Sequence, residues 1–133
     1  MKLTKLTPCC TVDAIEPSLP FWVDRLGFTS VAQVPHGDAL GFAMLVRGDV
    51  TVMLQSHASV LADIPAMADQ PLGGGVMLYL DVADLEPVLA AIEGVEVVVP
   101  TRETFYGTRE VWVRSPGGHI VGFAQDIKGE AGP

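Results

Sequence analysis

Two patterns of apolar residues follow one another along this chain, and each predicts a different kind of secondary structure. In short segments every second residue is apolar, which indicates strands because successive strand side chains point to opposite faces. Turn sequences such as "PHGD" and "RGD" separate some of these segments. The predicted strands cover residues 5–12, 28–34, 39–46, 50–56, 75–82, 95–100, 108–114 and 119–125.

Two other segments carry apolar residues at the spacing of a helix. The first, "EPSLPFWVDRLGF" (16–28), has prolines suited to a first turn and Gly27 suited to a stop. The second, "DLEPVLAAIEG" (84–94), begins with Asp84 as a candidate N-cap and ends at Gly94. The pattern therefore predicts one helix in each half of the chain.

The order strand, helix, strand, strand, strand thus occurs twice, at a spacing of roughly 70 residues. We predict an α+β fold of two βαβββ modules, 1–62 and 75–128, with each helix covering one face of its sheet. Residues 63–74 form the predicted linker, with room for a short helix, and 129–133 a frayed tail. The uncovered sheet faces would curve around a common cup-shaped hollow, so that the 133 residues make one fused domain.

The composition supports a folded domain. Hydrophobic residues make up 49% of the chain, which is ample for a core, and charged residues only 18%, which is not typical of disorder. No apolar run reaches the ~18 residues that cross a bilayer. The start "MKLTKLTPCC" lacks the apolar centre of a signal peptide. We therefore expect a soluble, cytoplasmic protein that does not contact a membrane.

Charge and cysteine content each argue against a class of function. The formal net charge of −8 argues against nucleic acid as a partner, because phosphate contacts need many Lys and Arg side chains. It permits a cationic ligand, although solubility alone accounts for it. Cys9 and Cys10 are adjacent on a predicted strand and point to opposite faces, so a disulfide between them would be strained. We expect free, packed thiols without a metal or redox role.

Three stretches of the sequence resemble one known family. They are "SLPFWVDRLGF" (18–28), "LYLDVADLEPVLAAIEG" (78–94) and "YGTREVWVRSPGGHIVGFAQ" (106–125). The chain resembles the vicinal oxygen chelate superfamily of glyoxalases, bleomycin-resistance proteins and extradiol dioxygenases. Ser115 and Gly117 stand where the family's turn has two Asp residues, yet "SPGG" still suits a turn. The resemblance implies paired βαβββ modules, a cup-shaped cavity and, commonly, a homodimer.

The resemblance also implies where a metal would be held. Enzymes of this superfamily bind a divalent metal through one His or Glu side chain from each of four strands. Strand alternation places Thr7, Met53, Met77 and Gly122 at the matching positions. Mg, Mn, Ni, Zn and Fe(II) need imidazole nitrogen or carboxylate oxygen, and thioether sulfur is too soft for most of them. We therefore predict no metal site and no cofactor, and we lean against an enzyme.

Other chemically useful groups are scattered along the sequence. Asp81 and Glu110 could act as acid and base, although strand carboxylates are commonly paired with arginine, here Arg109 or Arg114. The sequence has no Ser-His-Asp or Cys-His arrangement and no glycine-rich phosphate loop. Histidines in or beside predicted turns and strand ends more often face solvent than bind metal, and those of this chain are His36, His57 and His119.

Without a metal, the predicted cup is an apolar hollow with aromatic walls and a few carboxylates. Such a hollow suits a flat, partly cationic organic molecule, and the alternative is that the same side chains form packed core. In the strand 108–114, Val111 and Val113 would face the helix, which leaves Glu110 and Trp112 for the cup. The predicted ligand-binding residues are Cys9, Met53, Met77, Tyr79, Asp81, Tyr106, Glu110, Trp112, Ile120 and Gly122.

Within the superfamily the chain is most similar to the bleomycin-resistance branch. Its members are small and acidic, lack the metal ligands, and give antibiotic resistance by sequestering drug in dimer grooves. They carry an aromatic–Gly pair before the "RE" strand, which Tyr106 and Gly107 match here. By this resemblance, Tyr106 would stack on a planar ligand, with Trp112 and Glu110 nearby.

Three hypotheses follow for the function of the chain. The first is a metal-free homodimer that sequesters a small, partly aromatic molecule, either neutral or cationic. The second is a metal-dependent lyase, isomerase or dioxygenase of the glyoxalase type with non-standard ligands. The third is a dimeric interaction module that binds no ligand.

Overall fold

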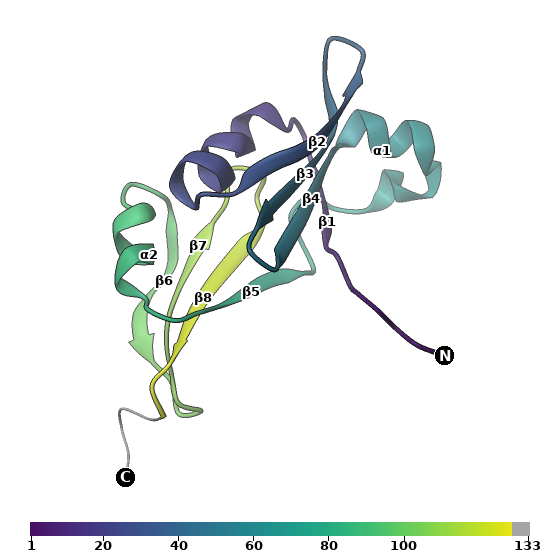
Figure 1. Ribbon diagram of the computed structural model, residues 1–133. Helices are drawn as coiled ribbons and strands as arrows, with labels where there is room; N and C mark the ends of the chain where they lie inside the picture. Colours follow the sequence, from purple (N-terminus) through teal and green to yellow (C-terminus); the bar gives the residue numbers. More distant parts are fainter. Residues whose placement is uncertain (129–133) are drawn as a thin grey trace.

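The strands form two four-stranded sheets, one from each half of the chain (Figure 1). The computed structural model describes residues 1–128, and the predicted tail, 129–133, lies outside the described residues. In spatial order the first sheet contains β1 (Cys9–Val12), β4 (Val50–Ser56), β3 (Ala39–Arg47) and β2 (Thr29–His36). The second contains β5 (Met77–Val82), β8 (Ile120–Asp126), β7 (Thr108–Arg114) and β6 (Val97–Glu103).

Both sheets have the same internal arrangement. The first strand of each module pairs in parallel with the last, β1 with β4 and β5 with β8, and the remaining pairs are antiparallel. The predicted two-module α+β fold is therefore confirmed. The first strand is shorter than predicted: it begins at Cys9 rather than at residue 5, and Pro8 has no N–H with which to extend the ladder.

The helix predicted between the first two strands exists, but not as an α-helix. It consists of a 3₁₀ turn, η1 (Glu16–Ser18), followed by a π-helix, η2 (Pro20–Arg25). Pro20 cannot donate an N–H to the carbonyl of Glu16, so a continuous α-helical ladder cannot form, and the Leu19 N–H bonds to Glu16 instead. In the second module α2 (Glu86–Ala91) begins two residues after Asp84, whose Oδ1 accepts the Glu86 N–H at 3.1 Å.

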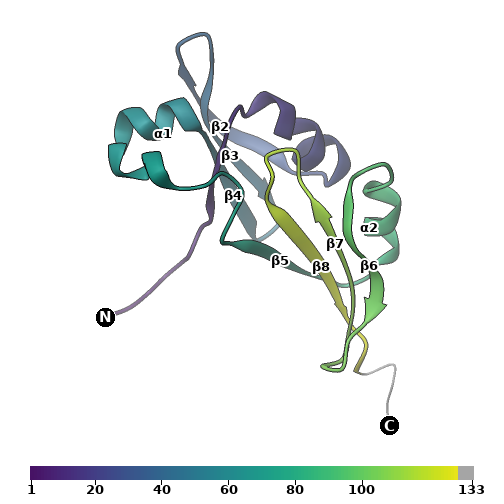
Figure 2. The same cartoon turned by 180° about the vertical axis from the view of Figure 1, so that it is seen from behind.

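The segment between the modules carries helical structure of its own. It contains α1 (His57–Asp63) and the 3₁₀ segment η3 (Pro65–Asp69), and the Ser56 side chain caps α1 by accepting the Ser59 N–H. Figure 2 shows that α1 and η3 lie beside the first sheet and away from the second. Within residues 1–128, no helix is long and apolar enough to cross a membrane.

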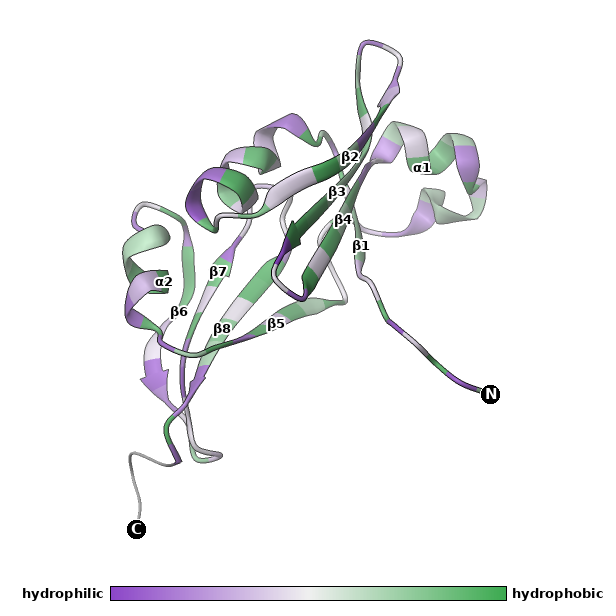
Figure 3. Cartoon of the chain, in the orientation of Figure 1, coloured by the Kyte–Doolittle hydropathy of each residue, from purple (hydrophilic) through white to green (hydrophobic). Residues whose placement is uncertain are grey.

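One hydrophobic core joins the two modules. Each sheet turns one face inward, and η2 packs between them with Trp22 in edge-on contact with Phe21 and Phe28 at ring-centroid distances of 5.1 and 5.2 Å. Figure 3 shows hydrophobic residues along β3 and β8 and on η2. The opposite face of each sheet points away from this core. Buried members from the two sheets include Ala43, Leu45, Val52, Leu54, Val111, Val113, Val121 and Phe123.

Two further contacts tie the halves together. The Arg25 guanidinium at the end of η2 donates through Nη1 to the carbonyls of Ala91 and Glu93 at 3.3 and 2.6 Å, and so satisfies the C-terminal end of α2. The linker passes directly over the β7–β8 turn. At Gly73 an added Cβ would lie 2.6 Å from the carbonyl carbon of Gly118.

Replacement of Gly73 by Ala should lower the free energy of unfolding by about 1–3 kcal/mol, because φ is +73° and the Gly118 backbone leaves no room. Urea unfolding followed by circular dichroism measures the change. The matched control is Gly74→Ala, whose Cβ would meet Pro71 no closer than 3.5 Å, so we expect a change within about 0.5 kcal/mol. Equal effects of the two substitutions would contradict the close packing of the linker on the turn.

Candidate functional site

The open face of the second sheet gathers most of the predicted ligand-binding residues. Strand register places Tyr79, Gly122 and Trp112 side by side in one row across β5, β8 and β7. The neighbouring row contains Asp81, Ala124, Glu110 and Arg102, and the row on the other side contains Met77, Ile120 and Arg114. Val111 and Val113 face the core as predicted, so the strand alternation in β7 is confirmed.

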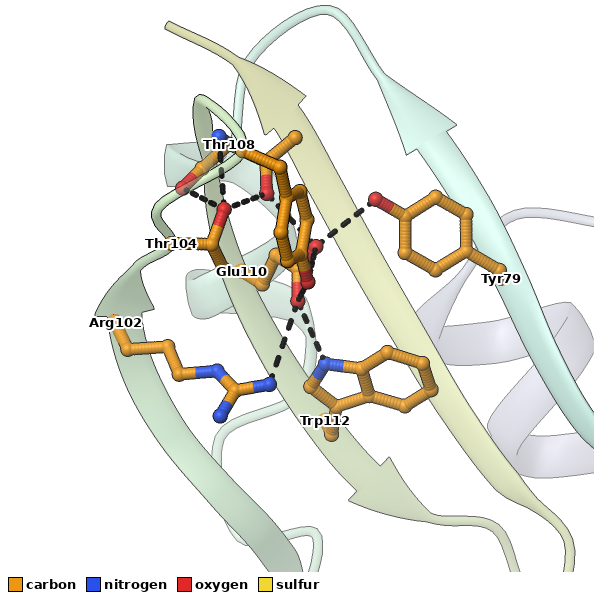
Figure 4. Close-up of polar contacts among 7 residues, drawn as sticks. Tyr79, Arg102, Thr104, Thr108, Glu110 and Trp112 are labelled. Atoms are coloured by element: carbon orange, nitrogen blue, oxygen red, sulfur yellow. Dashed lines mark hydrogen bonds and ion pairs between the residues drawn. The ribbon is translucent and has the colours of Figure 1, made fainter.

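The centre of this face is the carboxylate of Glu110, which has 0% of its surface exposed (Figure 4). It accepts hydrogen bonds from the Tyr79 hydroxyl at 2.9 Å, from Thr108 Oγ1 at 2.8 Å and from Trp112 Nε1 at 3.0 Å. The Tyr106 hydroxyl lies 3.0 and 2.9 Å from the two carboxylate oxygens. A buried charge needs such compensation, and here the compensation restrains three aromatic side chains.

The ion-pair partner of Glu110 differs from the expected one. Arg102 of β6 lies directly opposite Glu110 in the register, with its Nη2 3.8 Å from Oε1. Arg109 and Arg114, the arginines close in sequence, instead pair with exposed carboxylates, those of Glu86 at 2.8 Å and Glu96 at 3.0 Å. Sequence proximity failed here because Arg109 points to the other face of the strand, whereas the cross-strand neighbour shares the face.

Hydrogen bonding keeps Glu110 ionised. Burial by itself raises the pKa of Glu110, but the hydrogen bonds from Trp112, Thr108, Tyr79 and Tyr106 together outweigh burial and hold the pKa below its usual value. For Tyr79, burial and then the hydrogen bond and charge of Glu110 raise the pKa. The phenol of Tyr79 therefore remains protonated and acts as the donor. The negative charge of the cluster stays on the carboxylate of Glu110.

Gly122 has a structural reason for being glycine. The indole of Trp112, its direct partner in the register, lies across it, and a Cβ at Gly122 would come within 2.6 to 2.7 Å of three ring atoms. Trp112 in turn packs against Tyr79 with a ring-centroid distance of 5.8 Å. The position that the resemblance matches to a metal-binding glutamate is thus covered by an aromatic ring.

The residues present do not fit a divalent metal. Met53 and Met77 offer only thioether sulfur, Gly122 offers no side chain, and Thr7 precedes β1 rather than lying in it. Among the described residues no three His, Cys, Asp or Glu side chains are grouped so that they could hold a metal ion.

Aromatic and sulfur-containing side chains are left open to solvent on this face. Tyr79 is 47% exposed and Tyr106 44%, although both hydroxyls are bound to Glu110, and Met77 is also exposed. At the tip of the β6–β7 hairpin Phe105 is 100% exposed and meets Tyr106 edge-on at 5.1 Å. Rings that are fixed at one end and exposed at the other form a surface on which a flat molecule can stack.

Two of the predicted site residues lie on the first sheet instead. Cys9 pairs with Met53 in the register between β1 and β4, and its Sγ is 3.9 Å from Gln55 Oε1. Both cysteines are free. Burial raises the pKa of Cys9, and burial together with Cys9 raises that of Cys10 to about 11, so these thiols are poor nucleophiles at neutral pH.

The histidines do not all face solvent as expected. His36 is exposed at the end of β2, but His119 is buried in the β7–β8 turn, and burial lowers its pKa. His57 begins α1, and its Nε2 is buried without a hydrogen-bond partner. The position of His119 in a turn led us to expect an exposed side chain. That expectation was wrong because the linker packs over the β7–β8 turn.

Two members of the cluster, Arg102 and Thr108, were not among the predicted site residues. The signal for Thr108 was present, since it precedes Glu110 by two residues on the same strand and therefore shares its face. The pairing of Arg102 with Glu110 could not be predicted from the sequence. The register between β6 and β7 shifts twice between Val97 and Arg102.

This fold is of the vicinal oxygen chelate type, and the four positions that the resemblance matches to metal ligands, Thr7, Met53, Met77 and Gly122, carry neither His nor Glu. The family model described as "Glyoxalase/Bleomycin resistance protein/Dioxygenase superfamily" matches residues 6–123, and the chain belongs to that superfamily. No curated protein matches the chain.

Several solved structures have the same fold. A glyoxalase/bleomycin resistance protein/dioxygenase from Nocardioides has a TM-score of 0.77 at 20% identity, over 97% of this chain and 87% of its own. TnmS3, an antibiotic binding protein from Streptomyces sp. CB03234, has a TM-score of 0.73 at 21% identity, over 95% and 98%. The bleomycin-binding protein of Streptomyces verticillus has a TM-score of 0.63 at 24% identity, over 94% and 98%.

Replacement of Gly122 by Ala should lower the free energy of unfolding by about 1–3 kcal/mol, because the added methyl group collides with the indole of Trp112. The same substitution in a Trp112→Ala background should be nearly neutral. Urea unfolding of the four proteins of this double-mutant cycle gives the coupling energy, which we expect between about 0.5 and 3 kcal/mol. Additive effects would show that the ring does not cover Gly122.

Replacement of Glu110 by Gln should lower the free energy of unfolding at neutral pH by about 1–3 kcal/mol, because one of the two acceptor oxygens becomes an NH2 group that faces other donors. The pKa of Glu110 is lower in the folded state, so the unfolded chain binds protons first as pH falls. Wild-type stability should therefore be complete above about pH 4.3, the usual value for Glu, and decline as pH falls through the lower folded pKa.

The Gln variant should lack this part of the acid-induced decline, as measured by unfolding at a series of pH values. Glu96→Gln is the control, because Glu96 is an exposed carboxylate that pairs with Arg114 and should contribute at most about 1 kcal/mol. An unchanged pH dependence in the Glu110 variant would mean that this carboxylate is not compensated as described.

Proposed function

We propose that this protein is a metal-free binding protein that sequesters a small, planar aromatic molecule on the open face of its second sheet. The observation that carries the proposal is the pair of half-exposed tyrosines, Tyr79 and Tyr106, held by their hydroxyls on a buried carboxylate. Such an arrangement presents ring surface to solvent in a fixed orientation.

Preorganisation makes these rings suitable for binding. A side chain that is already restrained loses little conformational freedom when a ligand covers it, so more of the stacking energy contributes to affinity. Trp112 adds a third ring, fixed through its Nε1 and through its contact with Gly122. Exposed Met77 beside them can adapt to an irregular outline.

The charges near the site suggest how the ligand is oriented. Glu110 stays ionised, but hydrogen-bond donors and Arg102 compensate its negative charge, so the carboxylate does not itself attract a cation. The exposed carboxylate in the same row is Asp81, on the edge strand β5, and the guanidinium of Arg102 lies at the other end of the row. A ligand with a cationic group would place that group toward Asp81, and one with an acceptor group would place it toward Arg102.

We further propose that a second copy of the chain completes the site. In one chain the faces that carry Met53 and Met77 both point away from the shared core and leave apolar side chains uncovered. A homodimer that sets the first-sheet face of one chain against the second-sheet face of its partner would cover these side chains and enclose the ligand. The superfamily commonly forms homodimers, and the composition supports a cytoplasmic location.

The names of two structural neighbours agree with binding rather than chemistry. TnmS3 is described as an antibiotic binding protein, and the protein of Streptomyces verticillus as a bleomycin-binding protein. A metal-dependent lyase, isomerase or dioxygenase would need ligands that Thr7, Met53, Met77 and Gly122 cannot supply. A ligand-free interaction module is the remaining alternative, and exposed Phe105 is the feature that favours it.

Titration calorimetry with proflavine as a planar cation, acridone as a planar neutral molecule, and bleomycin should detect binding of at least one probe. Trp112→Ala and Tyr106→Ala should each weaken that binding by about 1–3 kcal/mol, because they remove stacking surface at the centre of the site. Ile64→Ala is the matched control, since it removes an exposed apolar side chain from the segment between the modules, outside both sheets, and should leave affinity unchanged.

Three outcomes would contradict the proposal. Unchanged affinity in both aromatic variants would place the site elsewhere. Tight, stoichiometric metal after incubation with Ni, Zn, Mn and Fe(II), measured by elemental analysis, would favour the enzyme. No binding of any planar probe to a protein that is dimeric by analytical ultracentrifugation would favour the interaction module.

A further inference from the structure

A cavity lies between the two modules. It is on the side of β5 opposite to the aromatic face, which is the open face of the second sheet with Tyr79, Tyr106 and Trp112. It has a volume of about 590 Å³, which is within the range of small-molecule sites. The first module contributes Leu26 and Phe28 at the end of η2 and Val50 at the start of β4. The second contributes mainly apolar residues of β5, α2 and β8, namely Leu80, Val82, Pro87, Val88, Ala91 and Phe123.

This cavity is separate from the site on the aromatic face. Leu80 and Val82 pack against the core, whereas Tyr79 and Asp81 alternate with them and turn to the other face of β5. Asp81 also lines the cavity, although the alternation directs its side chain to the other face of β5. The floor is formed by core residues such as Phe28 and Phe123, which are themselves buried.

Two arginines stand at the cavity, and both are held in place by main-chain carbonyls. Arg47 donates from Nη1 to the Leu26 carbonyl, and Arg25 donates from Nη1 to the carbonyls of Ala91 and Glu93. Within residues 1–128 neither arginine forms an ion pair with a carboxylate. Each guanidinium has five N–H donors, so both keep donors for a ligand.

The lining thus holds two guanidinium groups without a carboxylate ion-pair partner among the described residues, together with the acidic residues Asp81 and Asp84. Asp84 is the one acidic residue of the lining whose side chain is not on the opposite face of β5. Its Oδ1 already accepts the Glu86 N–H at the start of α2. Two guanidinium groups beside an apolar floor are complementary to a molecule with a carboxylate at one end and an apolar body.

We propose that the cavity between the modules binds a small amphipathic carboxylate. Its anionic group lies between Arg25 and Arg47, and its apolar body lies against Leu80, Val88 and Phe123. Because the arginines belong to the first module and this apolar wall to the second, the bound molecule bridges the two halves. It therefore also stabilises the folded chain, as any ligand specific to the native state does.

Titration calorimetry of the full chain with phenylbutyrate, phenylbutanol and phenylbutylamine tests the proposal. These probes share one apolar body and differ in charge. Phenylbutyrate should bind once per chain, at least about tenfold more tightly than the alcohol, which corresponds to about 1.4 kcal/mol, and the amine should bind most weakly. It should also raise the melting temperature.

Two variants locate the binding. Arg47→Gln keeps an N–H donor but loses the charge, so it should lower the affinity for phenylbutyrate several-fold toward that of phenylbutanol while Arg25 remains. Ala91→Phe fills the cavity while both arginines remain, and it should abolish binding of all three probes. Arg114→Gln, which removes an exposed guanidinium outside the cavity lining, is the control and should bind like wild type.

Each remaining result would overturn the proposal. Equal affinity for the acid and the alcohol in the wild type would show that the arginines do not select charge. Loss of phenylbutyrate binding in Trp112→Ala, with binding retained in Ala91→Phe, would assign it to the aromatic face. An absence of binding by a protein that unfolds at the wild-type temperature would mean that the cavity holds only solvent.

Discussion

A carboxylate with no exposed surface must find its hydrogen-bond donors inside the protein, and Glu110 finds them in side chains that would otherwise be free to move. Four groups donate to it, from Tyr79 on β5, Tyr106 in the β6–β7 hairpin, and Thr108 and Trp112 on β7. The compensation of one charge thereby fixes three rings from three segments of the second module. The exposed surface of the site is a consequence of this buried arrangement.

A second constraint is that the two sheets share one core. The faces that pack on η2 and α2 meet between the modules, so the faces with Met53 and with Tyr79 cannot also be enclosed by the same chain. This explains why the aromatic face is open in the single chain. The same arrangement leaves a space between the modules near Arg25 and Arg47, where η2, β5 and α2 meet.

The sequence predicted the fold well because the relevant signals are local. Alternation separated Val111 and Val113 from Glu110 and Trp112, and the structure confirms that separation. The exact form of the first helix was not predictable from apolar spacing, since it depends on the missing N–H of Pro20. The site was harder because its contacts join residues distant in the chain. Strand alternation placed Gly122 on the open face. The reason that this residue is a glycine is the indole of Trp112, which lies opposite it, and that contact depends on the register between β7 and β8.

The Gly122–Trp112 pair also limits which side chain this position of β8 can carry. A glutamate at Gly122 would need the space that the indole occupies, and removal of the indole would take a donor from Glu110. Glu110 would then keep a buried charge with fewer donors, which costs stability. A change from ring to metal ligand at this position therefore requires several coordinated substitutions. The aromatic face is a self-consistent alternative to a metal site, because each of its rings is needed by the carboxylate beneath it.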